Sequence, residues 1–348
     1  MTDLHPVIAA DVDAVLDHDL PWEALHGTTV LVTGASGMLP SYVVHTLLRL
    51  NDARDAGLTV LGLVRNEAKA RAVLAPYLDR PDFRLVVQDV ASPLLLDGPL
   101  DVVVHGASAA RPSLHSADPV GTMRANVLGT MSLLDLAVAK GARFALMSSA
   151  EVYGVQPEGT ELIDENSYGG FDILSPRACY SEGKRAAETL CAAYAHQHGV
   201  VCRIGRFGHI YGPGMALDDG RVQAEFAAKV LAGDDIVLNS DGTATRTYTY
   251  VADAVAGFFY ALLAGQDIVY NIADPDGLVS IRQLAEVFAA ARPEAGIGVT
   301  VKVADTTGLY SAAKAQGLSS ARLRGLGWQP RVSLAEGVSR MLASHETG

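Results

Sequence analysis

Two kinds of hydrophobic pattern alternate along the first two thirds of the chain. Short runs rich in Val, Leu and Ile are typical of buried strands, and between them apolar residues recur every three or four positions, as on one face of a helix. The runs predict strands over residues 28–33, 58–64, 83–87, 101–105, 143–148 and 200–207. The periodic stretches predict helices over residues 41–50, 67–77, 118–140 and 177–198. Because strands that alternate with helices indicate βαβ units, we predict an α/β fold with a Rossmann-type, doubly wound parallel sheet.

The two ends of the chain follow other patterns. Residues 1–26 predict an amphipathic helical extension that ends at Pro21 and has a packing role. After residue 207 the regular alternation loosens. We therefore predict a dinucleotide-binding domain over residues 27–207 and a smaller α+β substrate-binding lobe over residues 208–348. Within that lobe, the segment 267–272 is expected to return to the main sheet.

The composition narrows the class of protein. Hydrophobic residues make up 49% and charged residues 19% of the 348 residues, as in a folded globular protein. The net charge of -12 argues against a nucleic-acid partner, which would call for a basic face. Three scattered cysteines make neither a disulfide framework nor a zinc site, and no apolar run approaches the roughly 18 residues that span a bilayer. We expect a cytoplasmic protein without a metal site or a membrane anchor.

A glycine turn follows the first predicted strand and opens the first helix after it. Gly34 can take the sharp turn, and Gly37 lets the backbone approach a pyrophosphate, whose charge a helix N-terminus favours. Pro40 stands at the third glycine position, where proline is tolerated in the first helical turn but changes the packing of helix on strand. The turn predicts dinucleotide binding, against the alternative of a tight strand-to-helix turn alone. The expected cofactor residues of this turn are Gly34, Ser36, Gly37, Met38 and Leu39.

The choice between NAD and NADP depends on the end of the second strand. An acidic residue there would bind the ribose hydroxyls of NAD, whereas an arginine suits the 2′-phosphate of NADP. The strand ends at Arg65 without an acidic residue, so NADP stays open beside NAD. Asp89, after the third strand, is placed to reach the adenine amino group, and Val90, Ala107 and the helix residues Tyr180 and Lys184 complete the expected cofactor contacts.

Tyr180 and Lys184 lie four residues apart on the predicted helix 177–198 and therefore share one face. A phenol normally loses its proton near pH 10, and we expect the ammonium of Lys184 to lower the pKa of Tyr180. The pair can then remove a proton from a sugar hydroxyl as hydride leaves its carbon. Ser149, at the end of the preceding strand, is expected to hydrogen-bond the same substrate oxygen.

These motifs resemble those of a known protein family. The chain resembles the extended short-chain dehydrogenase/reductase family, which contains NAD-dependent sugar-nucleotide epimerases, dehydratases and decarboxylases. The resemblance runs from about residue 28 to residue 341 and rests on TGASGMLP, HGASAA, SSAEVYG, CYSEGK, GPG, RTYTYVADAV and LGWQP. It implies a nucleoside-diphosphate sugar as substrate, a bound NAD that takes hydride from the sugar and usually returns it, and a keto-sugar intermediate. It also implies a homodimer built on the helices 118–140 and 177–198.

The resemblance leaves several reactions open. Glu151 occupies the position at which dehydratases and decarboxylases of the family carry an acid/base group for the sugar ring. Ala150 replaces the aspartate of the 4,6-dehydratases and the hydroxyl residue of the UDP-glucuronate decarboxylases. The stretches 177–185 and 219–222 nevertheless look most like UDP-glucuronate decarboxylases, whose tyrosine-containing loop is replaced here by residues 110–115. We rank a nucleotide-sugar epimerase first and a UDP-glucuronate decarboxylase second, followed by a dehydratase or a keto-sugar reductase.

The remaining candidates would contact the substrate. His209 stands where the family usually has asparagine, and it is either a second acid/base group opposite Glu151 or a neutral hydrogen-bonding substitute. Arg246 and Arg221 are the expected ligands of the diphosphate, since a guanidinium can bind phosphate with two hydrogen bonds, and Arg111 is assigned to the substrate as well. A non-catalytic dinucleotide-binding sensor is the alternative from another class, but a sensor has no need of a Ser-Tyr-Lys set.

Overall fold

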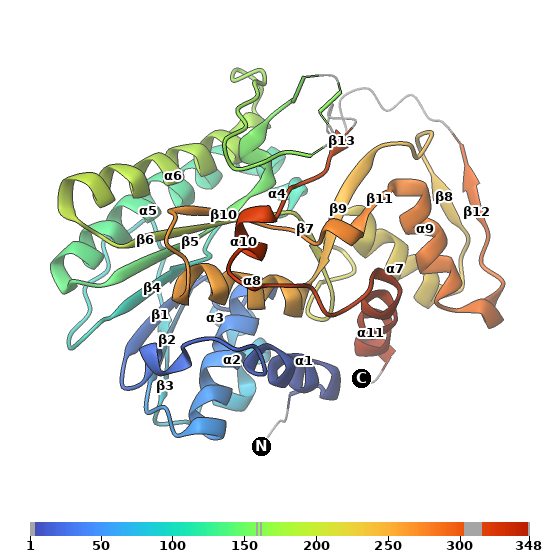
Figure 1. The fold of residues 1–348 in the computed structure, drawn as a ribbon. Coiled ribbons are helices and arrows are strands. Elements are labelled where there is room, and N and C mark those ends of the chain that lie inside the picture. The colour runs from blue at the N-terminus through green and yellow to red at the C-terminus, as the bar shows by residue number, and fades with distance from the viewer. Residues whose placement is uncertain (1–3, 158, 161, 303–314, 347–348) are drawn as a thin grey trace.

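A seven-stranded parallel sheet forms the centre of the computed structural model (Figure 1). The model describes residues 4–157, 159–160, 162–302 and 315–346. The strand order is β10-β6-β5-β4-β1-β2-β3, and every neighbouring pair is parallel. The strands are β1 (Thr29–Thr33), β2 (Thr59–Val64), β3 (Phe83–Val87), β4 (Val102–His105), β5 (Arg143–Ser149), β6 (Cys202–Phe207) and β10 (Val269–Ile272). The predicted doubly wound α/β fold is thereby confirmed.

Helices cover both faces of the sheet, which is why its strands read as continuous apolar runs. On one face α5 and α6 pack side by side against β4, β5 and β6, and on the other face α2 and α8 pack against β1, β2, β6 and β10. Successive residues of β1 enter the two cores in turn, Val30 and Val32 on one face and Leu31 on the other. The helices of this part are α1 (Pro6–Leu16), α2 (Met38–Arg54), α3 (Glu67–Val73), α4 (Pro112–Ala117), α5 (Pro119–Lys140), α6 (Ala178–His198) and α8 (Val251–Leu263).

One predicted helix was too long. α3 ends at Val73 instead of continuing to Tyr77, and a short 3₁₀ turn over Ala75–Tyr77 follows it. Pro76 lies inside this turn and has no N–H to continue the helical ladder. The short 3₁₀ helices are η1 (Trp22–Leu25), η2 (Ala75–Tyr77), η3 (Ala150–Tyr153), η4 (Pro275–Gly277) and η5 (Pro293–Ala295).

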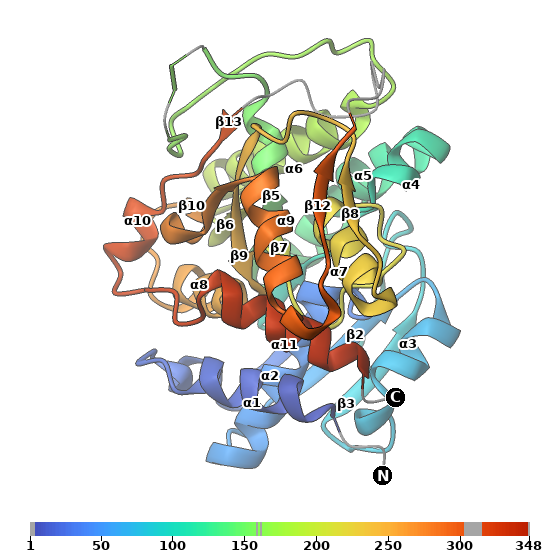
Figure 2. The ribbon, with the colours of Figure 1, turned by 90° about the vertical axis from the view of Figure 1, so that its right-hand side faces the viewer.

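The remaining elements form a smaller lobe beside the carboxyl ends of the strands (Figure 2). β9 is its central strand and pairs with β7, β11 and β13, while β8 and β12 pair separately. The stretch after residue 207 that looked irregular thus contains a strand, β7, in register with β9. The elements are β7 (His209–Tyr211), α7 (Val222–Ala232), β8 (Ile236–Leu238), β9 (Thr245–Tyr250), β11 (Leu278–Ser280), α9 (Ile281–Ala290), β12 (Val299–Val301), β13 (Ala315–Gln316), α10 (Ala321–Arg324) and α11 (Leu334–Glu346).

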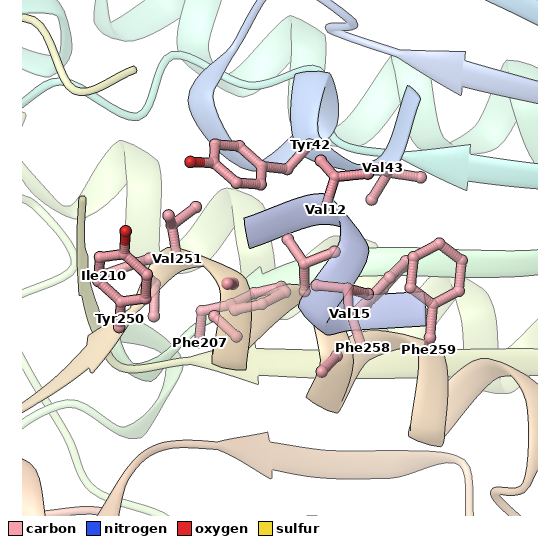
Figure 3. Packing of buried hydrophobic residues seen from close by; sticks show 14 of the residues in the cluster. Val12, Val15, Tyr42, Val43, Phe207, Ile210, Tyr250, Val251, Phe258 and Phe259 are labelled. Atoms are coloured by element: carbon pink, nitrogen blue, oxygen red, sulfur yellow. The ribbon is translucent and has the colours of Figure 1, made fainter. Parts of the chain in front are cut away.

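The N-terminal helix α1 is part of the core. Val12 and Val15 pack between Val43 of α2 and Phe258 of α8 (Figure 3). Beside them the fully buried carboxylate of Asp11 accepts hydrogen bonds from two tyrosine hydroxyls and pairs with one arginine. These partners are Tyr42 (3.0 Å), Tyr250 (2.7 Å) and Arg340 (2.9 Å). α1 therefore joins the large domain to the smaller lobe through a buried polar network, a role beyond the apolar packing that the sequence predicted.

None of the helices described here is both long enough and apolar enough to cross a bilayer.

Candidate active site

The turn after β1 packs closely against the loop after β4. Gly34 has a φ of +67°, and a Cβ there would lie 2.8 Å from the Cα of Ala107. Gly37 precedes the first residue of α2, Met38, so the turn leads directly into a helix N-terminus. A pyrophosphate fits this arrangement, because the helix N-terminus favours negative charge and the glycines remove the side chains that would obstruct it. Ala107 is held beside the turn by its N–H, which donates to Oγ1 of Thr33 at 3.1 Å.

Pro40 replaces the third glycine of the motif, and a neighbouring glycine accommodates it. A Cβ added to Gly106 would lie 2.6 Å from Cγ of Pro40. The proline ring therefore occupies the space that a side chain at position 106 would need. Ser36, Met38 and Leu39 are half-buried around the same turn.

Arg65 and Asp89 lie at the carboxyl ends of β2 and β3, as expected. Nη1 of Arg65 is 3.9 Å from Oδ2 of Asp89, and both side chains are exposed. Val90 is buried beside Gly129 of α5. The placement brings Arg65 and Asp89 together at the side of the cofactor turn, where the adenosine half of a dinucleotide would lie.

Tyr180 and Lys184 face the end of β5 from the first turns of α6. Nζ of Lys184 is buried, donates to the carbonyl oxygen of Met147 at 2.8 Å and lies 6.0 Å from the centre of the Tyr180 ring. Burial lowers the pKa of Lys184 to about 8, although Glu188, one turn further along the helix, raises it. The hydroxyl of Ser149 hydrogen-bonds to the phenol of Tyr180. The three predicted residues therefore form one cluster at the carboxyl end of β5.

The expected lowering of the tyrosine pKa is not found. Burial raises the pKa of Tyr180 above its ordinary value of 10, and the nearby charge of Glu151 raises it too. The hydrogen bond from Ser149 and the positive charge of Arg221 act in the opposite direction but do not outweigh burial. The groups that shift this pKa do not include Lys184, whose Nζ donates to the carbonyl oxygen of Met147. The protein's own groups thus leave Tyr180 protonated near neutral pH.

Glu151 lies directly beside this cluster. It follows Ser149 in η3, and its N–H donates to the Ser149 hydroxyl at 3.2 Å. Its Oε2 accepts a long hydrogen bond of 3.5 Å from Ser181, the neighbour of Tyr180 on α6. A carboxylate in this place can exchange a proton with a sugar carbon bound against Tyr180.

His209 lies at the start of β7, close to the positive charges of Arg221 and Arg246. Burial, with smaller effects from the positive charges of Arg246 and Arg221, lowers the pKa of His209 to about 3. Its ring packs at 5.5 Å against Tyr248, its register partner on β9. These surroundings favour the neutral hydrogen-bonding alternative for His209 over a second acid/base group.

Two of the predicted arginines meet at one acidic residue. Arg221 forms two hydrogen bonds to Asp219, of which the Nη2 to Oδ2 bond is 2.9 Å. Arg111 reaches the same carboxylate at 3.7 Å and the neighbouring Asp218 at 3.3 Å. A diphosphate that binds to these guanidiniums would therefore compete with Asp219 for them.

Arg246 is the most buried of the three arginines. Its Nη1 donates to its neighbour's carbonyl, Thr245 O, at 2.7 Å. Burial lowers the pKa of Arg246, whereas Tyr248 and the charge of Glu151 raise it. The charges of Arg246 and Glu151 therefore act on each other at the reacting end of the site. The same arginine is the predicted ligand of a diphosphate.

The comparisons with known proteins agree with this geometry. A model of the NAD dependent epimerase/dehydratase family matches residues 30–273. The chain belongs to this family. It is similar to UDP-glucuronic acid decarboxylase 6 of Arabidopsis thaliana, with 34% identity over 315 residues that cover 90% of this chain and 87% of that protein.

Solved structures of the family have the same fold. DesIV, a dTDP-glucose 4,6-dehydratase of Streptomyces venezuelae with NAD and TYD bound, has a TM-score of 0.77 at 26% identity and covers 91% of this chain and 97% of its own. The UDP-glucose 4-epimerase of Thermus thermophilus in complex with NAD has a TM-score of 0.74 at 26% identity and covers 92% and 100%. The chain is thus an enzyme of the epimerase/dehydratase/decarboxylase group, as its motifs predicted. The sequence similarity supports a decarboxylase, which was ranked second, better than the epimerase that was ranked first.

Two residues of this epimerase/dehydratase site were not predicted. His115, in α4, stacks on the ring of Tyr180, and Asp219 holds two of the predicted arginines. The short distance in sequence between Asp219 and Arg221 was a signal for their pairing. No local pattern pointed to His115, because its contact depends on how the loop after β4 folds back onto α6.

Proposed function

We propose that this protein is an NAD-dependent UDP-glucuronate decarboxylase, which oxidises C4 of the sugar and releases its carboxylate as carbon dioxide. The observation that carries the proposal is the placement of Glu151 and two arginines around the Ser149-Tyr180 pair. A substrate with both a diphosphate and a sugar carboxylate needs several cations in one site. The positive charge of Arg221 acts on Tyr180, and that of Arg246 interacts with Glu151. Both charges act on His209. The similarity to a UDP-glucuronic acid decarboxylase over 90% of the chain supports the same reaction.

Oxidation of C4 is the first step of the proposed reaction. Tyr180 removes the proton of the C4 hydroxyl, and Ser149 keeps that oxygen in place by a hydrogen bond. NAD⁺, when bound, supplies the acceptor for the hydride that leaves C4. Because the phenol is protonated near neutral pH in the ligand-free protein, the bound ligands must favour its phenolate. Lys184 holds its own proton close to the phenol ring throughout.

The C4 ketone makes the carboxylate at C5 labile. When the bond between C5 and the carboxylate carbon breaks, its electron pair moves toward the C4 oxygen, where the hydroxyls of Tyr180 and Ser149 donate hydrogen bonds to the developing negative charge. Glu151, after it takes up a proton from water, delivers that proton to C5. Tyr180 returns its proton to the C4 oxygen when that carbon is reduced again.

NAD is the proposed cofactor. Gly34, Gly37 and the N-terminus of α2 would hold its pyrophosphate, and Asp89 lies where the adenosine would be. Arg65, the residue that kept NADP open, has the carboxylate of Asp89 as a partner at 3.9 Å, which opposes the addition of a 2′-phosphate there. DesIV and the Thermus thermophilus epimerase are both complexes with NAD, which supports the same choice.

A nucleotide-sugar 4-epimerase is the second candidate, and Ala150 favours it. UDP-glucuronate decarboxylases carry a hydroxyl residue at this position, whereas this chain has a buried alanine in η3. The argument from two opposed acid/base groups no longer supports the epimerase, because His209 stays neutral. An epimerase would instead return hydride to the other face of C4.

The test is a substrate panel with carbon dioxide as the readout. Purified enzyme is incubated with UDP-glucuronate labelled with ¹³C at the carboxylate, and with UDP-glucose and UDP-galacturonate. We expect labelled carbon dioxide from UDP-glucuronate with the wild type, and roughly 1000-fold slower release with Tyr180→Phe. In Glu151→Gln we expect release to be slowed by about 100-fold, within the usual range for a group that transfers a proton. A new isomer that keeps the carboxylate would contradict the proposal.

A homodimer built on α5 and α6 is part of the proposal. Leu128, Met131 and Val138 are exposed on one face of α5, where a solvent-facing surface would normally be polar. We expect light scattering after gel filtration to give a dimer mass for the wild type and a monomer mass for Met131→Glu. A monomeric wild type at micromolar concentration would contradict it.

A further inference from the structure

One residue outside the proposed proton-transfer set lies in direct contact with its base. The imidazole of His115 is parallel to the phenol ring of Tyr180, with 4.4 Å between the ring centres and 12° between the planes. His115 comes from α4, in the loop that follows β4, and its side chain is buried with 8% exposure. Two rings from distant parts of the chain are thus stacked where the substrate oxygen would be deprotonated.

His115 is itself held in place from two sides. Its Nε2 is 2.5 Å from the carbonyl oxygen of Ala109, and because a carbonyl can only accept, Nε2 carries the proton. Its own carbonyl oxygen accepts a 3.7 Å hydrogen bond from Sγ of Cys179, the residue before Tyr180. α4 is therefore tied to the beginning of α6 by a backbone contact and by the ring stack, and the imidazole cannot rotate without breaking its bond to Ala109.

We propose that His115 is a positioning residue: its neutral imidazole holds the Tyr180 ring in the orientation that proton transfer requires and keeps water from that face of the phenol. The inference rests on the proposed function of Tyr180 as the base.

The charges around the stack favour a neutral imidazole. Burial lowers the pKa of His115, and the positive charges of Arg177 and Arg221 lower it further, while the bond to Ala109 raises it. In a parallel stack the nitrogen lone pair of the imidazole lies in the plane of its own ring and does not point at the phenol. His115 can therefore orient Tyr180 but cannot take its proton through the stack.

Exclusion of water has a consequence that can be measured without substrate. Burial is the largest cause of the raised pKa of Tyr180, whose other charged and polar neighbours are Ser149, Glu151, Lys184 and Arg221. Removal of the imidazole would let water solvate the phenolate and lower that pKa. An aromatic ring in its place would not.

The experiment compares His115→Ala, His115→Phe and a matched control in the full-length enzyme. His198→Ala is the control, since His198 also touches a tyrosine of α6, Tyr194, at 5.3 Å between ring centres, but on an exposed part of the helix. With UDP-glucuronate we expect His115→Ala to lower kcat about tenfold with KM within twofold, as an aromatic pair contributes at most about that factor. His115→Phe should recover kcat to within about threefold of wild type, and His198→Ala should equal wild type. Thermal unfolding of each variant controls for folding.

The second readout is independent of the reaction. In enzyme labelled with ¹³C at Cζ of tyrosine, the Tyr180 signal is identified by its absence in Tyr180→Phe, and its titration is followed without ligands. We expect Tyr180 to titrate at lower pH in His115→Ala than in wild type, and His115→Phe to follow wild type. An unchanged titration in His115→Ala, or a His115→Phe variant that behaves like His115→Ala, would overturn the proposal. Because these spectra need no turnover, they decide the role of His115 even if no sugar nucleotide is converted.

Discussion

The candidate site has two parts, a floor and a rim, whose side chains are held in different ways. The floor consists of Ser149, Tyr180 and Lys184, which lie at the end of a central strand and on one face of a long helix. The rim consists of Arg111, Arg221 and the acidic pair Asp218 and Asp219, which come from loops and contact one another as ion pairs. Burial changes the pKa of the floor residues Tyr180 and Lys184, whereas the rim pairs join the buried carboxylate of Asp219 and the exposed one of Asp218 to partly exposed arginines. We therefore expect the floor to carry the chemistry that needs a fixed geometry and the rim to bind the diphosphate.

The largest effect is expected on the floor, from Tyr180→Phe. This substitution removes only the phenolic oxygen and keeps the ring under His115. We expect kcat with UDP-glucuronate to fall by roughly 1000-fold, which is the scale of general acid–base catalysis. Retention of more than a tenth of the wild-type rate would show that another group removes the proton.

The cofactor turn offers a matched pair of glycines. Gly34 and Gly27 have nearly the same φ, +67° and +68°, but only at Gly34 would a Cβ meet backbone, at 2.8 Å from Ala107. Gly27→Ala should cost about 1 kcal/mol of unfolding free energy, from left-handed strain alone. Gly34→Ala should cost more and weaken NAD binding by at least tenfold, as measured by calorimetry. Equal effects of the two substitutions would mean that the close approach to Ala107 is unimportant.

The lowered pKa of Lys184 predicts that activity falls with rising pH, whereas the contribution of this residue to stability rises. Burial lowers the pKa of Lys184 to about 8 in the folded state, from an ordinary value of 10.5. Above pH 8 the ammonium is lost and kcat/KM should decrease. Between about pH 8 and 10.5 the unfolded chain binds more protons at this residue than the folded one does, so its contribution to the free energy of unfolding should rise with pH. Urea unfolding at several pH values should show that rise as the difference between wild type and Lys184→Met, because buried tyrosines with raised pKa values contribute in the opposite direction in both proteins.

The smallest effect is expected at the rim. Asp219→Asn removes the carboxylate that pairs with Arg221 and Arg111 while keeping its shape. Because a diphosphate no longer has to displace a negative charge, we expect the Kd for UDP to fall by about threefold at low salt and by less at high salt. Asp218→Asn, at an exposed side chain with a single pair to Arg111, is the control and should change the Kd less. Weaker UDP binding in Asp219→Asn would mean that Asp219 orients the arginines instead of competing for them.

The same division explains what the sequence could predict. Apolar runs and helical periodicity located the seven strands of the main sheet and its long helices, because burial on both faces of a sheet dictates composition locally. Gly34, Gly37, Tyr180 and Lys184 could be found because each pair lies within a few residues of the chain. The pKa of Tyr180 could not, since it depends on burial by elements far apart in sequence.

Contacts between distant segments of the chain were harder to predict for the same physical reason. The contact of Arg111 with Asp219 joins residues more than one hundred positions apart, and the stack of His115 on Tyr180 joins two segments that no local pattern brings together. The neutral state of His209 depends on burial and on Arg221 and Arg246 together. These side chains therefore acquire their surroundings from tertiary contacts that neither propensity nor spacing encodes.

The central claim is that the floor oxidises C4 of a UDP-hexuronate and that the adjacent carboxylate then leaves. The most direct measurement is mass spectrometry of the product formed from UDP-glucuronate by wild-type enzyme in deuterated water. We predict a UDP-pentose that has lost carbon dioxide and gained one carbon-bound deuterium, at C5. A UDP-hexuronate isomer of unchanged mass would contradict the account and establish a 4-epimerase.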